Sequence, residues 1–115
     1  SFNNLLLNLA RQVQSQKVFK QLIPSDSIII YPAVSEIKKA ADSINLNSDE
    51  EKILNLIDGQ KSIQNLQEST DWPAEKTFEI VYRLIVVGLI SVRSEELEIS
   101  EDYKVDNIIP FPQKL

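Results

Sequence analysis

The segment SDEEKILNLIDG, residues 48–59, carries the clearest structural pattern in the chain. Ser48 and Glu51 have the spacing of a capping box, in which each side chain bonds the backbone amide of the other residue. The three acidic side chains that follow Ser48 also favour the positive end of a helix dipole. Apolar residues then supply one face, and Gly59 supplies a left-handed stop. The pattern predicts a helix that begins at Ser48 and ends just before Gly59.

Two more helices are predicted immediately downstream. Residues 62–69 form a short amphipathic segment, and residues 70–73 form a turn that contains Trp72 and Pro73. Proline is favoured in the first turn of a helix because its missing N–H is not needed there. The third predicted helix therefore starts at Pro73 and runs to Val87, with a glycine directly after it.

A β-hairpin is predicted after these helices. Residues 89–92 alternate as a strand does, and residues 97–99 alternate as an antiparallel mate would. The tip between them lacks the glycine typical of a tight turn, so its geometry is left open. Three helices followed by a hairpin is the order of a winged helix. We therefore predict a winged-helix-like unit over residues 46–100.

The N-terminal part is predicted to be helical as well. Residues 2–23 show two helical stripes of apolar residues, rotated from each other, with a bend or a change of partner expected near residues 14–17. Pro24 ends this long helix, because the residue before proline avoids helical angles. A short strand over residues 28–31 and a short helix over residues 34–44 complete this part.

These elements define an α+β, mostly helical protein. It has a long N-terminal helix, a short strand, and a winged-helix-like three-helix unit with a β-hairpin. The expected organisation is residues 1–45 as the N-terminal helix, strand and connecting helix, residues 46–100 as the winged-helix-like unit, and residues 101–115 as a polar C-terminal tail. The chain contains no methionine, so we also expect it to be a fragment of a longer protein.

Composition excludes several kinds of chemistry. The chain has no cysteine and no histidine, which removes disulfides, thiolate catalysis, zinc fingers and the Ser-His-Asp triad. Only two glycines are present, far apart, so no glycine-rich loop cradles phosphate. The sequence has no run of apolar residues long enough to span a membrane, and residues 1–10 lack the basic flank and the small-residue cleavage site of a signal peptide. We expect a cytoplasmic protein that is not an enzyme and that has no cofactor and no metal site.

The acidic clusters have a structural explanation. Residues 49–51 could suggest a metal site, but carboxylates at a helix start are far more often caps. The glutamates at positions 95, 96 and 98 suit a solvated turn. Neither cluster predicts a catalytic or metal-binding centre.

DNA binding is the main alternative for a winged helix. The third helix would enter the major groove, and the residues placed to contact DNA would be Lys76, Arg83 and Arg93. Acidic residues interrupt both the third helix and the hairpin, and the chain as a whole carries a net charge of −5. Since DNA affinity depends on positive charge facing phosphate, nucleic acid is an improbable partner.

Protein binding or self-association is the favoured interpretation. The residues named as candidates are Leu5, Leu9, Val13, Trp72 and Phe111. For Leu5, Leu9 and Trp72, the alternative explanation is burial in the core. For Phe111, which lies in the C-terminal tail, the alternative is that the tail has no fixed structure. Exposed apolar side chains on the first helix would favour partner binding.

Several segments together resemble the PATAN family. They are the stretches LLLNLAR (5–11) and FKQLIPS (19–25), residues 50–63, and the stretch FEIVYRL (78–84) followed by Gly88-Leu89-Ile90. The resemblance spans residues 3–93, but residues 12–16 lack the acidic residue and tryptophan typical of relatives. PATAN is a bacterial domain of largely unassigned biochemistry, found beside receiver domains in signalling and motility regulators. The resemblance implies the C-terminal part of such a domain, acting as a protein-interaction adaptor without catalytic residues.

Overall fold

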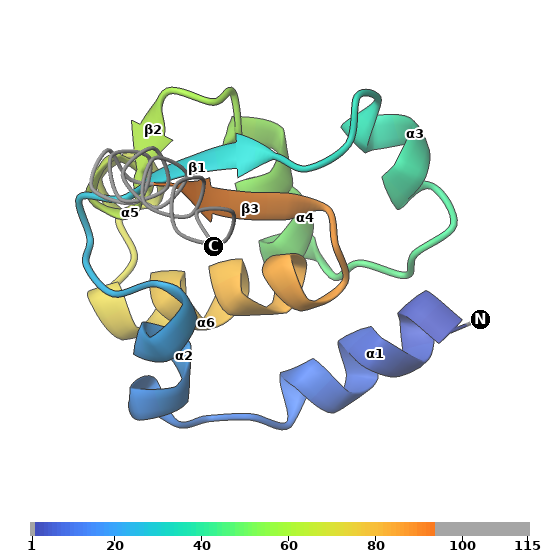
Figure 1. Cartoon of the computed structure of the whole chain (residues 1–115), viewed down its shortest axis with the longest axis horizontal. Coiled ribbons are helices and arrows are strands. Elements are labelled where there is room, and N and C mark those ends of the chain that lie inside the picture. Colours follow the sequence, from blue (N-terminus) through green and yellow to red (C-terminus); the bar gives the residue numbers. More distant parts are fainter. Residues whose placement is uncertain (1, 94–115) are drawn as a thin grey trace, which may run out of the picture.

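The computed structural model describes residues 2–93 and shows an α+β, mostly helical fold, as the sequence predicts (Figure 1). In chain order, the elements are α1 (Phe2–Arg11), α2 (Gln16–Leu22), β1 (Ile29–Pro32), α3 (Ile37–Ala41), α4 (Ser48–Leu56), β2 (Lys61–Ser62), α5 (Ile63–Thr70), α6 (Ala74–Val86) and β3 (Ile90–Arg93). Within residues 2–93, no helix combines the length and the apolar character needed to cross a membrane.

The three strands form one antiparallel sheet in the order β2-β1-β3. Ile29 in β1 lies opposite Ser62 on one side and Arg93 on the other. β1 therefore occupies the middle of the sheet, although it comes first in the sequence. The sheet cannot form without the N-terminal part of the chain.

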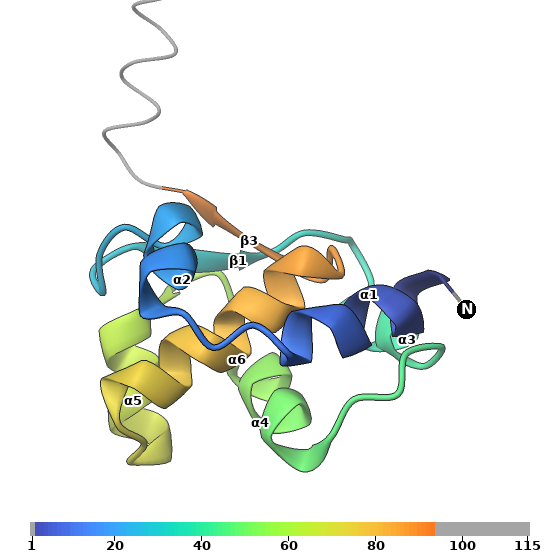
Figure 2. The same ribbon diagram turned by 90° about the horizontal axis from the view of Figure 1, so that it is seen from below.

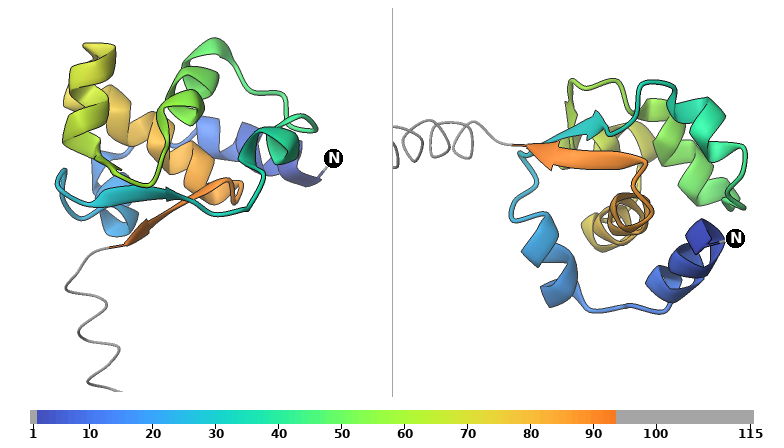
Figure 3. Two further views of the ribbon diagram at one scale, coloured as in Figure 1. Left: turned by 90° about the horizontal axis from the view of Figure 1, so that it is seen from above. Right: turned by 45° about the vertical axis from the view of Figure 1, so that its right-hand side comes forward.

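Helix α6 lies at the centre of the fold. The sheet covers one side of it, and α1 and α2 cover the opposite side (Figures 1 and 3). Helices α4 and α5 also contact α6. Its apolar residues are therefore buried in several directions; the buried ones are Phe78, Ile80, Val81 and Leu84.

The two segments separated at residue 45 in the sequence analysis share a single core. Leu7, Phe19 and Ile30 from the first segment belong to the same buried cluster as Leu66 and Leu84 from the second. The tail over residues 101–115 lies outside the described residues, as do Phe111 and the predicted strand over residues 97–99.

The prediction of one long N-terminal helix was wrong. The chain forms two helices, α1 and α2, separated by residues 12–15. Ser15 caps α2 by accepting a hydrogen bond from the Val18 amide at 3.3 Å. The two apolar stripes face different directions along the chain, and the break lets both Leu7 and Phe19 reach the core beside α6.

The start of α4 also differs from the prediction. The capping residue is Asn47, one position before Ser48, and the box glutamate is Glu50. Asn47 Oδ1 accepts from the Glu50 amide at 2.9 Å, and Glu50 Oε1 accepts from the Asn47 amide at 2.9 Å. Asparagine and serine are about equally good caps, so the sequence did not decide between them. The shift of one residue turns Glu50 rather than Glu51 towards the interior.

The other boundaries differ from the predictions by a few residues. α3 covers only Ile37–Ala41 of the segment expected to be helical, and Pro73 lies at the N-cap of α6 instead of inside it.

Gly88 ends α6 with a φ of +83°. The Leu89 amide donates to the Leu84 carbonyl at 3.1 Å and the Gly88 amide to the Ile85 carbonyl at 3.0 Å, which is the bonding pattern of a Schellman motif.

Candidate functional site

An apolar stripe of exposed side chains runs along α1. Phe2, Leu5 and Leu9 are 71%, 54% and 53% exposed, respectively. Their spacing of three and four residues places them on one face of the helix. We call Phe2, Leu5 and Leu9 the α1 stripe. The opposite side of the same helix is already used by the fold, because Leu7 and Ala10 are buried there.

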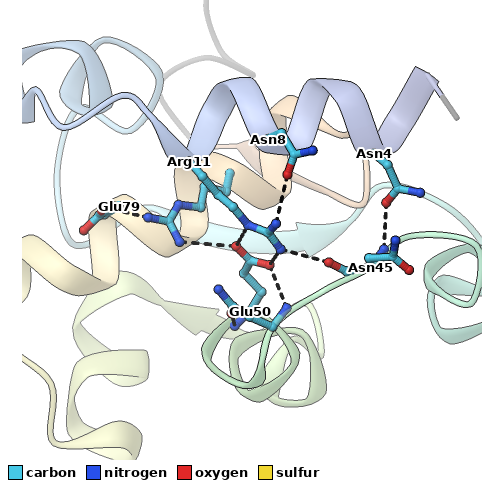
Figure 4. Close-up of polar contacts among 8 residues, drawn as sticks. Asn4, Asn8, Arg11, Asn45, Glu50 and Glu79 are labelled. Atoms are coloured by element: carbon cyan, nitrogen blue, oxygen red, sulfur yellow. Dashed lines mark hydrogen bonds and ion pairs between the residues drawn. The ribbon is translucent and has the colours of Figure 1, made fainter.

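Besides its apolar packing, the inner side of α1 is attached to the rest of the protein by polar contacts. Arg11 reaches from the end of α1 to Glu50 at the start of α4 (Figure 4). Its Nε lies 2.9 Å from Glu50 Oε2, and its Nη2 lies 2.6 Å from Glu50 Oε1. Near the other end of α1, Asn4 Oδ1 accepts from the Asn45 amide at 2.7 Å.

Glu50 is the most deeply buried charged group among the described residues, with no exposed surface. Besides the two bonds from Arg11, it accepts one from Arg83 Nη1 at 3.2 Å and one from the Asn47 amide. Arg83 also pairs with Glu79 at 2.7 Å. Four hydrogen bonds fill the accepting positions of a carboxylate, and two arginines balance two glutamates, so the buried charge is compensated.

The surroundings of Glu50 determine its charge state. Burial raises the pKa of the Glu50 carboxyl, but the hydrogen bonds from Arg11, Asn47 and Arg83 and the charge of Arg11 outweigh it, so the pKa is lower than usual. The bond to Glu50 correspondingly raises the pKa of Arg11. Glu50 therefore stays ionised at neutral pH. All of its bonds hold it in place between α1, α4 and α6, which makes it a structural group of the fold.

The sequence did not predict the network around Glu50. Arg11 and Glu50 lie 39 residues apart, and Arg83 lies 33 residues beyond Glu50. The only local indication was the run of acidic residues at the predicted helix start, which placed Glu50 in the first turn but not in the interior.

Val13 and Trp72, the other described candidates for partner binding, are less exposed than the α1 stripe. Val13 follows the end of α1 and packs partly buried against the core. Trp72 also packs partly buried against the core, with Lys76 Nζ 4.5 Å and Lys52 Nζ 5.9 Å from its ring centre. Phe2, which was not among the predicted contact residues, is the most exposed large apolar residue of those described.

Two of the three candidate DNA-contacting residues, Lys76 and Arg83, are engaged within the protein. The Arg83 side chain is 12% exposed and binds Glu50 and Glu79. Lys76 pairs with Asp49 at 3.1 Å and lies over Trp72. Arg93 ends β3, and only its backbone is described. In addition, α1 and α2 cover α6 on the side away from the sheet (Figure 2).

The acidic residues at the start of α4 do not converge. Asp49 faces Lys76, Glu50 is buried, and Glu51 lines a cavity of about 330 Å³ between α3 and α4. The charged lining of that cavity consists of Lys38 and the carboxylates of Asp42 and Glu51. Across residues 2–93, no group of three or more acidic side chains is placed to hold a metal ion.

Comparison with models of known families, with curated proteins and with solved structures finds no match to this chain. The PATAN resemblance and the adaptor function it implies therefore remain predictions. The α1 stripe holds the three most exposed large apolar side chains of residues 2–93, and the fold does not explain their exposure.

Proposed function

We propose that the chain is a non-enzymatic protein-interaction module whose docking surface is the α1 stripe. The single observation that supports this is the exposure of Phe2, Leu5 and Leu9 on a helix whose other side already packs on the core. Leaving large apolar side chains in water costs free energy, and contiguous patches of them mark interaction sites. The resemblance to PATAN suggests an adaptor or regulatory role in bacterial signalling or motility control.

The order α4, β2, α5, α6 and β3 supports a winged-helix-like interpretation of residues 46–100. In this fold β1 pairs with one edge of β3, so a mate at residues 97–99 would have to pair with the opposite edge. Such a unit would serve as a scaffold, because its third helix is central to the core.

The DNA-binding alternative has less support. Arg83 would have to leave Glu50 and Glu79 before it could reach a base, and α1 and α2 would have to move off α6. Breaking a buried ion pair on one side leaves an uncompensated charge behind, which is costly. A groove-reading role for α6 would therefore need a large rearrangement.

Photo-crosslinking tests the proposed docking surface. A photoreactive amino acid replaces Leu9 in the stripe, or, as a matched control, Leu22 in α2, which is 40% exposed but lies outside the stripe. We expect crosslinks to protein from position 9 in the cells that make this chain, and none from position 22. Equal yields from both positions, or none from either, would contradict the proposal.

Light scattering with duplex DNA at low salt tests the alternative. Non-specific DNA binding is strongest at low ionic strength because counterion release drives it. We expect no increase in mass on addition of DNA. A mass increase that disappears at high salt would replace the interaction module with a DNA-binding regulator.

A further inference from the structure

We infer that the cavity between α3 and α4 binds a small aliphatic compound with two ammonium groups and one carboxylate, which is the charge pattern of a basic amino acid. The cavity has a volume of about 330 Å³, within the range of small-molecule sites. No residue of the α1 stripe lines it. The inference therefore goes beyond the proposed function and does not rest on it.

Two helix faces form the walls of this cavity, which we call the α3–α4 cavity. Lys38 in α3 and Asp42 at its C-cap line one wall. Glu51 and Asn55 line the other wall, in α4. The members of each pair are four residues apart, so they lie on the same side of their helix. Because the linker over residues 42–47 brings the two helices together, both pairs flank the same space (Figure 1).

The charged groups of the α3–α4 cavity have no partner among residues 2–93. The side chains of Lys38, Asp42 and Glu51 form no ion pair and no hydrogen bond in this part of the chain. By contrast, the neighbouring Lys39 lies 3.9 Å from Glu36, outside the cavity. The three charges that line the cavity are therefore available to a ligand.

Apolar side chains form the rest of the lining. Ile44 and Leu54 are buried, and Ala41 and Leu46 pack half-buried against the core. None of the side chains of α3 is fully buried, so that helix does not fill the space. A chain of methylene groups laid over these residues would remove apolar surface from water, which is favourable.

The charges of the lining select the ligand. Two carboxylates and one ammonium group line the cavity, which leaves an excess of one negative charge. A compound with two ammonium groups and one carboxylate offers an opposite charge to each of them. A simple amine would leave Lys38 unmatched, and a simple acid would leave Asp42 and Glu51 unmatched. The methylene chain of lysine also suits the apolar lining, which makes L-lysine the appropriate probe.

The exposure of the charged groups sets the strength of binding. Lys38, Asp42 and Glu51 are all exposed, and ion pairs at exposed sites contribute little each. We therefore expect a dissociation constant for L-lysine of about 1 mM. Binding should weaken as salt is added, because salt screens exposed charges.

An NMR titration of the isotope-labelled chain with L-lysine is the first test, at constant pH and ionic strength. Amide signals from residues 38–55 should shift and saturate, while those of α5 stay in place. Three probes each lack one charged group: cadaverine has no carboxylate, ε-aminocaproate no α-ammonium, and norleucine no ε-ammonium. Each should bind about three- to fivefold more weakly than L-lysine, the effect of one exposed ion pair.

Substitutions in the lining test which residues hold the ligand. Lys38→Gln and Glu51→Gln should each weaken L-lysine binding about three- to fivefold. Lys39→Gln and Glu68→Gln remove the same charges outside the cavity and should leave binding unchanged. Lys38→Gln should also abolish the preference for L-lysine over cadaverine, because that preference comes from the ligand carboxylate beside Lys38.

The outcomes decide between a site and a solvated hollow. The absence of a saturable shift up to about 20 mM L-lysine overturns the site. Equal affinities for L-lysine and norleucine, or equal effects of the cavity variants and their controls, overturn the assignment of the ligand. None of these results bears on crosslinking from position 9, so the proposed function is tested separately.

Discussion

Helices α1 and α6 lie side by side, yet different interactions hold them in place (Figure 2). α6 buries Thr77, Phe78, Ile80, Val81 and Leu84, and other elements surround it. α1 buries only Leu7 and Ala10, and its end is fixed by the ion pair from Arg11 to Glu50. A helix held by apolar packing cannot leave without unfolding the core. α1 packs fewer apolar side chains on the core and adds a few polar bonds, so we expect it to loosen before the core unfolds while its outer face stays available to a partner.

Leu84→Ala should give the largest loss of stability. Leu84 is fully buried in α6, and deleting a leucine side chain in a core costs about 4 kcal/mol, through lost burial and the cavity left behind. Urea unfolding followed by Trp72 fluorescence measures the loss. Leu22→Ala removes the same atoms from an exposed site and should cost less than about 1 kcal/mol. Similar losses of stability from Leu84→Ala and Leu22→Ala would contradict the idea that burial in α6 makes Leu84 the more important residue.

Glu50→Gln should lower the free energy of unfolding by about 3 kcal/mol, because two arginines lose their buried counter-charge. Glutamine can still complete the capping box with Asn47, so α4 should form as before. Glu51→Gln, one residue along on the exposed side, is the matched control and should change stability by less than about 0.5 kcal/mol. A Glu50→Gln variant as stable as the control would mean that the network contributes nothing.

Arg11→Gln should lower the free energy of unfolding by about 2 kcal/mol, since Glu50 keeps its bonds from Arg83 and Asn47. The sharper readout is amide hydrogen exchange, which resolves local opening from global unfolding. Exchange in α1 should accelerate well before exchange in α6 does. Lys17→Gln, an exposed residue in α2, is the control. Equal acceleration in both helices would show that α1 cannot loosen alone.

Of these changes, acidification should have the smallest effect on the free energy of unfolding. The pKa of Glu50 is lower in the folded chain than the usual 4.5, so the unfolded chain binds the proton first. The stabilisation is complete above about pH 4.5 and is lost as the pH falls through the folded value. Urea unfolding over this acidic range should therefore show a weaker pH dependence in Glu50→Gln than in the unsubstituted chain. Identical slopes would contradict the lowered pKa. Asp58→Asn is the comparison variant, because the Asp58 pKa is lowered by Lys61 at an exposed site.

Local sequence patterns determined most of the elements. Periodic apolar residues and turn residues predicted α4, α5, α6, β1 and β3 within a few positions. Gly88 marked the end of α6 because a left-handed backbone angle is easy only for glycine. These predictions succeed because helix caps, helix stops and strand alternation depend on residues close together in the chain.

Only the tertiary structure decided how these elements combine. The position of β1 between β2 and β3 and the burial of Glu50 both depend on contacts between residues tens of positions apart. Leu5 and Leu7 look alike in the sequence, yet one is exposed and the other buried. Which leucine of an apolar helix faces the core depends on where its neighbours pack. The sequence already offered Leu5 and Leu9 as candidates, but only the burial of the opposite side of α1 showed that they lie with Phe2 on its exposed face.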